Sequence, residues 1–182
     1  LTTNNLSVYL GFVAKFAPAG GSLVYSTLIG NEQETSTGVR LRDVAVDPLG
    51  KAYAVGYATS DSYPLNDPLQ AALAGGRDSV LTVLHPNGAG QLSPMTSSFF
   101  HSTYLGGTGN DEALGVALPG PGDVVFVGVT GSADFPIQDP IEPSPLGGSD
   151  AFVVRVTDST NNLIFADGFG WGDTSSWSQA LP

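Results

Sequence analysis

The chain has 182 residues, of which 41% are hydrophobic and only 13% are charged, and its formal net charge is -11. This negative charge repels nucleic acid and anionic lipid surfaces, so we expect neither as a partner. The sequence contains no Cys, which excludes disulfides and thiolate metal sites.

Glycine and proline punctuate the whole chain, with 24 and 13 residues respectively. They occur too often for long helices and indicate many short strands joined by turns, so we predict an all-β protein. No apolar run has the roughly 18 to 20 residues of a membrane helix, and no membrane insertion is expected. The even Ser, Thr, Gly and Asn content favours a bacterial extracellular or cell-surface protein. Because the start at Leu1 lacks a signal peptide, we expect a secreted form to be already processed.

Residues 1–10 form a predicted N-terminal strand segment ahead of the repeated part of the chain. Within it Leu6, Val8 and Leu10 alternate with polar or aromatic residues, which is typical of a strand. This segment can supply a strand that the end of the chain lacks. Within one molecule that pairing closes a ring; between molecules, head to tail, it gives an open filament.

Residues 11–78 form the first long repeat, in which alternation and β-branched or aromatic content predict four strands. These strands are expected at residues 12–16, 23–29, 39–46 and 52–57. Turn residues separate them at 18–21 and 47–50. The following segment, 60–77, contains two prolines and a Gly pair, so we predict a long crossover to the next repeat, anchored by Tyr63.

Residues 79–150 form the second repeat, and residues 151–166 begin a third. The segment from Val44 matches the segment from Val116, an offset of 72 residues, and YSTLIG from Tyr25 matches HSTYLG from His101, an offset of 76. The string AFVVRV from Ala151 matches GFVAKF and SVLTVL at the starts of the first two repeats. The chain therefore contains about two and a half repeats.

The strings GFVAKFAPAGGSLVYSTLIG, HSTYLGGTGNDEALGVAL, KAYAVGYATSDSYP and GGSDAFVVRV resemble the SBBP-type β-propeller repeat of bacterial secreted and surface proteins. The resemblance covers roughly residues 11–165. It implies one antiparallel four-stranded blade per repeat and an extracellular setting, and it prescribes no catalytic residues. Two and a half repeats do not close a ring, whose blades typically number about four to eight. We therefore expect a partial propeller, completed by more chain or by other copies.

The tail, residues 167–182, begins with DGFGWGDTSSWS, which resembles a short C-terminal element of some Gram-negative secreted proteins. If the tail is such an element, the natural C-terminus is expected at or near Pro182. Trp171 and Trp177 both lie in this tail. Exposed aromatic side chains there could bind a sugar or a partner surface, whereas packing onto the last blade is the competing interpretation.

The acidic segment Asn110, Asp111 and Glu112 offers oxygen ligands for a metal. A Gly-rich acidic loop can fold carboxylates and carbonyls around calcium, which is a hard cation. The segment lacks the alternating acidic pattern of an EF-hand loop, so a solvated turn is the competing interpretation. No other cofactor is expected.

The remaining polar candidates have simpler structural interpretations. His85 and His101 lack partners at the spacing of a zinc or catalytic site, so we expect a turn and a strand residue. Asp78 and Asp150 precede strands, so turn or strand-entry hydrogen bonds are expected. Four further carboxylates could be imagined as a hydrolase pair, but repetition of one at the same crossover position favours a structural role; these are Asp61, Asp67, Asp134 and Asp139.

We therefore predict no catalytic residues and a non-enzymatic extracellular structural protein that self-associates through β-strand edges, as a filament or surface-matrix subunit. The main alternative is a carbohydrate- or protein-binding adhesin module of a larger secreted propeller, whose partner is a glycan or a surface protein. A third alternative is an enzyme whose active site lies on blades outside this sequence.

Overall fold

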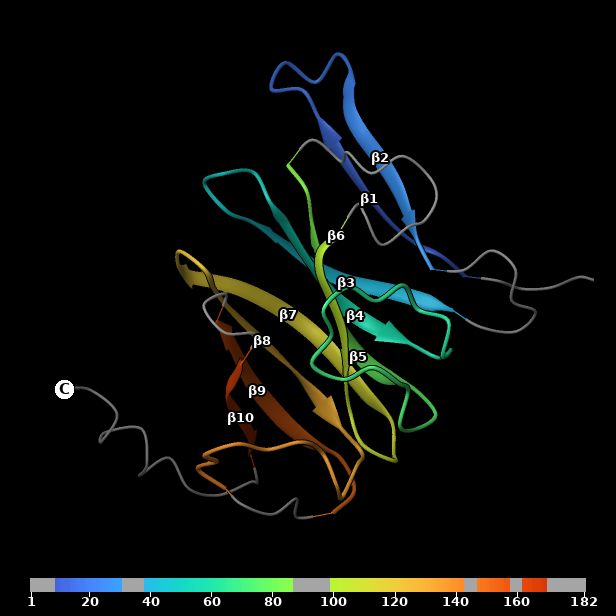
Figure 1. Ribbon diagram of the computed structural model, residues 1–182, viewed down its shortest axis with the longest axis vertical. Helices are drawn as coiled ribbons and strands as arrows, with labels where there is room; N and C mark the ends of the chain where they lie inside the picture. The colour runs from blue at the N-terminus through green and yellow to red at the C-terminus, as the bar shows by residue number, and fades with distance from the viewer. Residues whose placement is uncertain (1–8, 31–37, 87–98, 143–146, 158–161, 170–182) are drawn as a thin grey trace, which may run out of the picture.

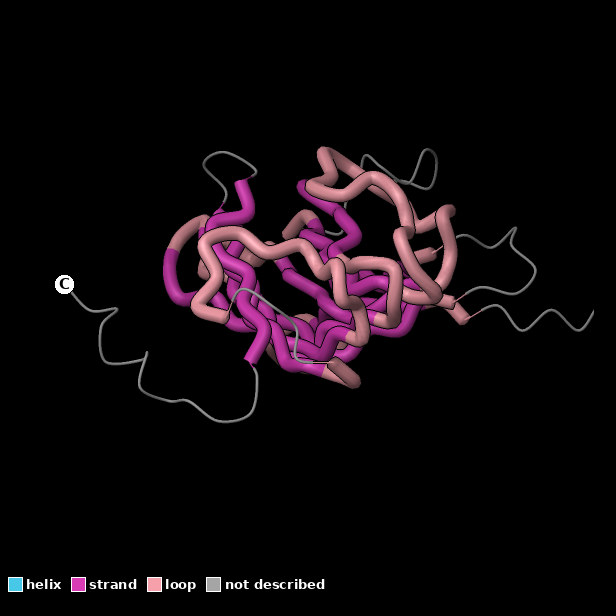
Figure 2. The backbone as a smooth tube through the Cα atoms, turned by 90° about the horizontal axis from the view of Figure 1, so that it is seen from below, coloured by secondary structure: helices cyan, strands magenta, loops and turns pink. Residues whose placement is uncertain are grey.

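The computed structural model describes residues 9–30, 38–86, 99–142, 147–157 and 162–169, and these ranges form ten strands and no helix (Figures 1 and 2). The all-β prediction is therefore confirmed. No helix that could span a membrane occurs in these ranges. In chain order the strands are β1 (Gly11–Phe16), β2 (Leu23–Ile29), β3 (Val39–Val46), β4 (Ala52–Ala58), β5 (Asp78–Leu84), β6 (Phe99–Leu105), β7 (Asp111–Gly120), β8 (Asp123–Thr130), β9 (Asp150–Thr157) and β10 (Asn162–Phe169).

The strands form three antiparallel sheets. The N-terminal sheet contains β1 and β2; the middle sheet has the order β3-β4-β5-β6; the C-terminal sheet has the order β10-β9-β8-β7. The three sheets follow one another from the blue end to the red end of Figure 1. β7 packs against β3, β4 and β5, and β1 contacts β3, so the middle sheet lies between the other two.

The sheets do not coincide with the predicted repeats. The sequence predicts one four-stranded unit in residues 11–78, but the structure separates β2 from β3 and pairs β4 with β5 across the repeat boundary. In the same way β9 and β10 complete the C-terminal sheet with β7 and β8, instead of starting an unfinished unit. Alternation and turn residues locate strands, but they do not say which strands pair. The predicted grouping of strands into four-stranded units was therefore wrong by two strands.

The predicted crossover, residues 60–77, was also wrong. This segment joins β4 to β5, which are neighbours in one antiparallel sheet, and residues 131–149 join β8 to β9 in the same way. Its prolines keep it out of the ladder, but they are equally compatible with a long hairpin loop. The predicted anchor is confirmed, because Tyr63 is buried and its ring lies 5.4 Å from that of Tyr104 in β6.

The two central strands of the middle sheet, β4 and β5, are buried on both faces because neighbouring sheets cover them. All residues of β4 and β5 are buried. Toward the C-terminal sheet, Tyr53, Val55 and Leu81 pack with Phe126 and Phe152. Fully burying an aliphatic or aromatic side chain of this size stabilises the fold by roughly 1.5–3 kcal/mol. These sheet-to-sheet contacts are therefore a main source of stability.

The opposite face of the middle sheet packs toward the N-terminal sheet. Its buried cluster joins Val80, Leu84 and Tyr104 of the middle sheet to Ile29 of β2. Val13 of β1 packs against this cluster while remaining partly exposed. The three sheets are thus consecutive layers of one packed stack, with an apolar junction on each side of the middle sheet.

Candidate functional site

One edge of the N-terminal sheet has no strand beside it among the described residues. In the sequence repeat β1 corresponds to β5 and β2 corresponds to β6. The pairing agrees, because Phe12 pairs with Leu28 as Val80 pairs with Tyr104. In the middle sheet β5 is also hydrogen-bonded to β4 on its other side. Among the described strands β1 pairs with β2 alone, so within this part of the chain it presents a free edge where β5 has a neighbour.

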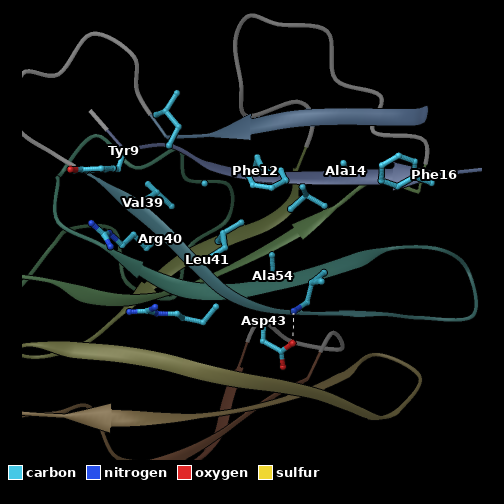
Figure 3. A pocket seen from close by; sticks show the side chains of 14 residues that line it. Tyr9, Phe12, Ala14, Phe16, Val39, Arg40, Leu41, Asp43 and Ala54 are labelled. Carbon is cyan, nitrogen blue, oxygen red and sulfur yellow. Dashed lines mark hydrogen bonds between the residues drawn. The ribbon is translucent and has the colours of Figure 1, made fainter. Parts of the chain in front are cut away.

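A groove of about 690 Å³ lies beside this free edge, between β1 and β3 (Figure 3). Figure 3 shows Val39, Leu41 and Phe12 among the side chains around it. At the next junction β4 packs against β7, which takes the place of β3 in the repeat. The groove therefore marks the position that a strand equivalent to β4 would occupy, and its lining is mainly apolar.

The outer face of the N-terminal sheet exposes side chains that its counterpart buries. Phe12 is 68% exposed and Phe16 is 63% exposed, whereas the equivalent Val80 and Leu84 are 0% and 1% exposed. We call Phe12, Phe16 and Leu28 the rear face, since they alternate with residues that point toward the middle sheet. Within the described ranges no sheet covers the rear face in the way that Val80 and Leu84 are covered.

The outer face of the C-terminal sheet likewise exposes side chains whose equivalents in the middle sheet are buried. Val127 and Val129 of β8 are 42% and 37% exposed, although the equivalent Val55 and Tyr57 are buried. Val125, Val127, Val129 and Val153 are together called the forward face. The same two kinds of face meet inside the molecule. At the junction between the middle and C-terminal sheets, the middle-sheet residues equivalent to the forward face pack onto the C-terminal-sheet residues equivalent to the rear face.

The two internal junctions use the same main-chain contacts. The amide of Val39 donates to the carbonyl of Tyr9 at 2.8 Å, and the amide of Asp111 donates to the carbonyl of Arg77 at 2.9 Å. Parallel bridges join Tyr9 to Gly38 and Arg77 to Asn110. The stacking of sheets is thus a repeated, specific arrangement rather than a general apolar contact.

Asp78 and Asp111 lie at the second junction and are both fully buried. Oδ2 of Asp78 accepts hydrogen bonds from Nε2 of Gln70 at 2.7 Å and from the amide of Ala74 at 2.8 Å. The predicted strand-entry hydrogen bonding of Asp78 is therefore confirmed. Burial raises the pKa of Asp78 above its usual value, and the nearby carboxylate of Asp111 acts in the same direction. The hydrogen bonds from Ala74 and Gln70 oppose this rise.

Asp111 is held in a similar way by neighbouring loops. Its Oδ2 accepts hydrogen bonds from the amide of Gly107 at 2.8 Å and from Oγ of Ser132 at 2.7 Å. Asp78 and Asp111 thus connect the β4–β5, β6–β7 and β8–β9 loops. A sequence search for the ligands of one loop misses this pair, because its members are 33 positions apart along the chain.

The predicted calcium trio does not converge on one point. Glu112 faces away from Asp111, as successive strand residues do, and its Oε1 lies 2.5 Å from Nε of Arg42. Its Oε2 lies 3.4 Å from Nη1 of Arg77. Asn110 is exposed. In the described ranges no three His, Asp or Glu side chains gather as a metal site would need. Calcium binding at this trio therefore gains no support from the geometry and stays a prediction.

The other carboxylates have structural surroundings. Asp67 and Asp139 have φ values of 50° and 49°, a left-handed conformation at the same position of two loops. Oδ1 of Asp61 accepts a hydrogen bond from the amide of Leu73 at 3.2 Å. Oδ1 of Asp134 accepts hydrogen bonds from the amide and Oγ1 of Thr108, which lower the pKa of Asp134.

The remaining predicted residues divide between described and undescribed parts of the chain. His101 lies in β6 opposite Val83, and His85 follows β5. Asp150 opens β9 and is partly buried. Leu10 is partly buried and lies just before β1 rather than in a strand. Four predicted binding or assembly residues lie outside the described residues: Leu6, Val8, Trp171 and Trp177.

No family model matches the chain, and no curated protein matches it either. The resemblance to SBBP-type repeats therefore remains an expectation from the sequence.

Proposed function

We propose that this chain is a non-enzymatic extracellular structural protein whose copies associate head to tail, as a subunit of a filament or surface matrix. In this proposal the three sheets act as propeller-type blades, and the stack continues from one copy into the next. One observation carries the proposal. The chain exposes a rear face at one end and a forward face at the other, and it packs faces of these same two types together internally.

The two end faces support a head-to-tail contact. Phe12 and Val127 belong to different faces, so contact between the forward face of one copy and the rear face of the next uses two different patches. Such a heterologous contact leaves both outer faces available again and extends indefinitely unless its rotation closes a ring. A ring would need the copies to return to their starting orientation, whereas a filament needs no such condition.

The free edge of β1 supports strand-to-strand association in addition. Exposed edges pair readily with an extended segment of another chain. In the middle sheet, Ala52 pairs with Leu84 and Ala58 with Asp78. An added strand of a second copy would pair with Phe16 and Leu10 in the same register, and it would cover the groove between β1 and β3.

The net charge opposes association and gives it a salt dependence. Copies that each carry a charge of -11 repel one another at low ionic strength. Salt screens this repulsion, with a Debye length of roughly 30 Å at 0.01 M and 8 Å at 0.15 M. Assembly by apolar faces should therefore strengthen as sodium chloride rises, which is the opposite of assembly by complementary charges.

Two blocked variants test the head-to-tail contact. Phe12→Glu places a charge on the rear face, and Val127→Glu places one on the forward face; both positions are exposed, so neither change should unfold the chain. We expect each variant alone to be monomeric in sedimentation velocity, and a mixture of the two to form a one-to-one dimer through the faces that remain. Leu49→Glu is the matched control, because Leu49 is 76% exposed on the β3–β4 turn and belongs to neither face.

Electron microscopy of the unmodified protein at high concentration and 0.5 M sodium chloride decides the form of the assembly. Filaments support the proposal, and closed rings of fixed size would replace the filament with a ring. A monomer at every concentration, or a mixture of the two blocked variants that stays monomeric, would contradict head-to-tail association.

A synthetic peptide of residues 51–59, which contains β4, tests the free edge. We expect it to bind the protein and to shift the backbone NMR resonances of β1 and β3. A peptide of the same composition in scrambled order is the control. Equal binding of both peptides, or shifts confined to other strands, would mean that this edge does not take an added strand.

A further inference from the structure

Arg42, Arg77 and Glu112 form a charged cluster at the second junction, where the middle sheet meets the C-terminal sheet. Oε1 of Glu112 lies 2.5 Å from Nε of Arg42, and its Oε2 lies 3.4 Å from Nη1 of Arg77. Both guanidiniums also lie over the ring of Tyr57, at 5.6 Å and 4.9 Å from its centre. Glu112 is only 7% exposed, so this junction buries a carboxylate together with its counter-ions.

Arg40 and Tyr9 hold the corresponding positions beside the groove between β1 and β3. The parallel bridges that precede β3 and β7 match Tyr9 with Arg77, and two residues further along they match Arg40 with Glu112. Figure 3 shows Tyr9 and Arg40 at one end of the groove, and the guanidinium lies 4.8 Å from the centre of the ring. Among the described residues Arg40 has no carboxylate partner. The charge at this position is therefore reversed and unpaired.

A sheet laid against the rear face would cover Arg40 as the middle sheet covers Glu112. Arg40 is exposed in the chain by itself. Taking a guanidinium out of water is costly unless a carboxylate pairs with it. The ring of Tyr9 offsets part of this cost. At the second junction the counter-ion from the covering sheet is Arg42, so the sheet that covers Arg40 should carry a carboxylate in that place.

The forward end of this chain has Leu114 in that place. The register of β3 shifts around Arg42 and that of β7 shifts around Leu114, so each is the extra residue of a β-bulge. Oδ2 of the next residue, Asp43, accepts a hydrogen bond from the amide of Val116 at 2.9 Å across the second junction. Its counterpart Gly115 has no side chain that accepts a hydrogen bond. A second copy therefore covers the rear face with apolar contacts but brings no counter-ion for its arginine.

We propose that the rear face has a preferred neighbour other than a copy of this chain: a β-sheet of another protein that presents a carboxylate in the place of Arg42, opposite Arg40. The ion pair adds to the apolar contacts that a copy of this chain also makes. Such a partner holds the rear end of a stack of copies and so anchors it. The proposal rests on the proposed function only in taking the rear face as a stacking surface.

The two blocked variants allow this preference to be measured in the full chain. Val127→Glu keeps an open rear face and serves as the receptor, while Phe12→Glu keeps an open forward face and serves as the probe. Leu114→Glu, added to the probe, places a carboxylate opposite Arg40, and Leu114→Arg is the matched control of opposite charge. Leu114 is 47% exposed, so neither change should unfold the chain. By calorimetry we expect the Leu114→Glu probe to bind about 3- to 10-fold more tightly than the probe with Leu114, and the Leu114→Arg probe to bind more weakly than both.

Arg40→Glu in the receptor reverses the charge at the rear face and should reverse the order of the probes. Leu114→Arg should then bind most tightly. Equal affinity of all three probes, or an order that Arg40→Glu leaves unchanged, would overturn the preference even where copies still stack. Binding of the Leu114→Glu probe without binding of the probe with Leu114 would support the preference and contradict self-association. Binding of no probe would overturn both.

Discussion

Tyr63 lies against Tyr104, with ring centroids 5.4 Å apart, and the amide of Tyr63 donates a hydrogen bond to the hydroxyl of Tyr104 at 3.1 Å. The hydroxyl of Tyr104 in turn donates to the carbonyl of Ser60. In the equivalent loop of the C-terminal sheet, Phe135 takes the place of Tyr63 but stacks at 4.7 Å on Phe152 of β9, a strand that corresponds to β5 rather than to β6. One buried ring therefore fixes each long hairpin loop onto its own sheet.

Replacing Tyr63 tests this anchor. Tyr63→Ala removes a ring that is 3% exposed, and we expect a loss of about 3–5 kcal/mol in the free energy of unfolding. Tyr63→Phe removes only the hydroxyl, which is hydrogen-bonded to Thr82, and we expect a loss of about 0.5–1.5 kcal/mol. Urea unfolding followed by circular dichroism measures both losses. Similar losses for the two variants would mean that the ring contributes little.

Gly56 in β4 is required because its neighbour leaves no room for a side chain. A Cβ at this position would lie 1.9 Å from the carbonyl oxygen of Arg40, and at Gly128 the corresponding distance to the carbonyl of Glu112 is 2.1 Å. We expect Gly56→Ala to lower the free energy of unfolding by about 1–3 kcal/mol, or to prevent folding. Gly21→Ala is the control, since nothing lies within 4 Å there and a change under about 0.5 kcal/mol is expected. Equal stability of the two variants would contradict the close approach.

The ion pair between Arg42 and Glu112 links the middle sheet to the C-terminal sheet. Arg42 is 43% exposed, so solvent and salt screen the pair, and we expect a coupling of only about 0.2–1 kcal/mol. A double-mutant cycle with Arg42→Met and Glu112→Gln, measured by urea unfolding, gives this coupling. The coupling energy should fall when sodium chloride rises from about 0.02 to about 0.5 M, because salt screens the attraction between exposed charges. A coupling that does not change with salt would indicate a pair shielded from solvent.

Asp134 provides a pH-dependent contact between two loops. The amide and Oγ1 of Thr108 donate to its carboxylate, so its pKa in the folded protein lies below the ordinary value of 3.8. Because the folded pKa is the lower one, the contact stabilises the fold above about pH 3.8 and is lost as the pH falls through the folded pKa. Carboxyl carbon NMR shifts give the midpoint. We expect Thr108→Val to move it part of the way back toward the ordinary value, and an unchanged midpoint would show that Oγ1 has no effect.

Strand positions were predictable from the sequence because each strand carries its own local signal. Alternating β-branched residues and flanking turn residues mark the strands at 23–29 and 39–46, and the structure has β2 and β3 there. The turn between β3 and β4 follows from Asp47 and Gly50, whose contacts are local: Oδ1 of Asp47 accepts from the amides of Leu49 and Lys51. The pairing of β4 with β5 was not predictable, because partners 20 or more residues apart leave no mark in local alternation.

The candidate sites were less predictable for a related reason. Asp111 was found as an acidic residue near Asn110 and Glu112, but its actual neighbour is Asp78, which the fold brings in from another strand. The signal that could have found the pair is the repeat itself, since Leu10 and Val39 hold the equivalent positions in the first junction. An exchange of two apolar residues for two carboxylates at matched positions points to a shared environment.

The two-strand shift between repeats and sheets has a consequence for how the chain is made. β3 and β4 come from one repeat, whereas β5 and β6 come from the next. During synthesis a repeat therefore waits for half of its successor before its sheet is complete. Because each full repeat contributes strands to two sheets, cutting the chain inside one repeat would affect the stability of two sheets.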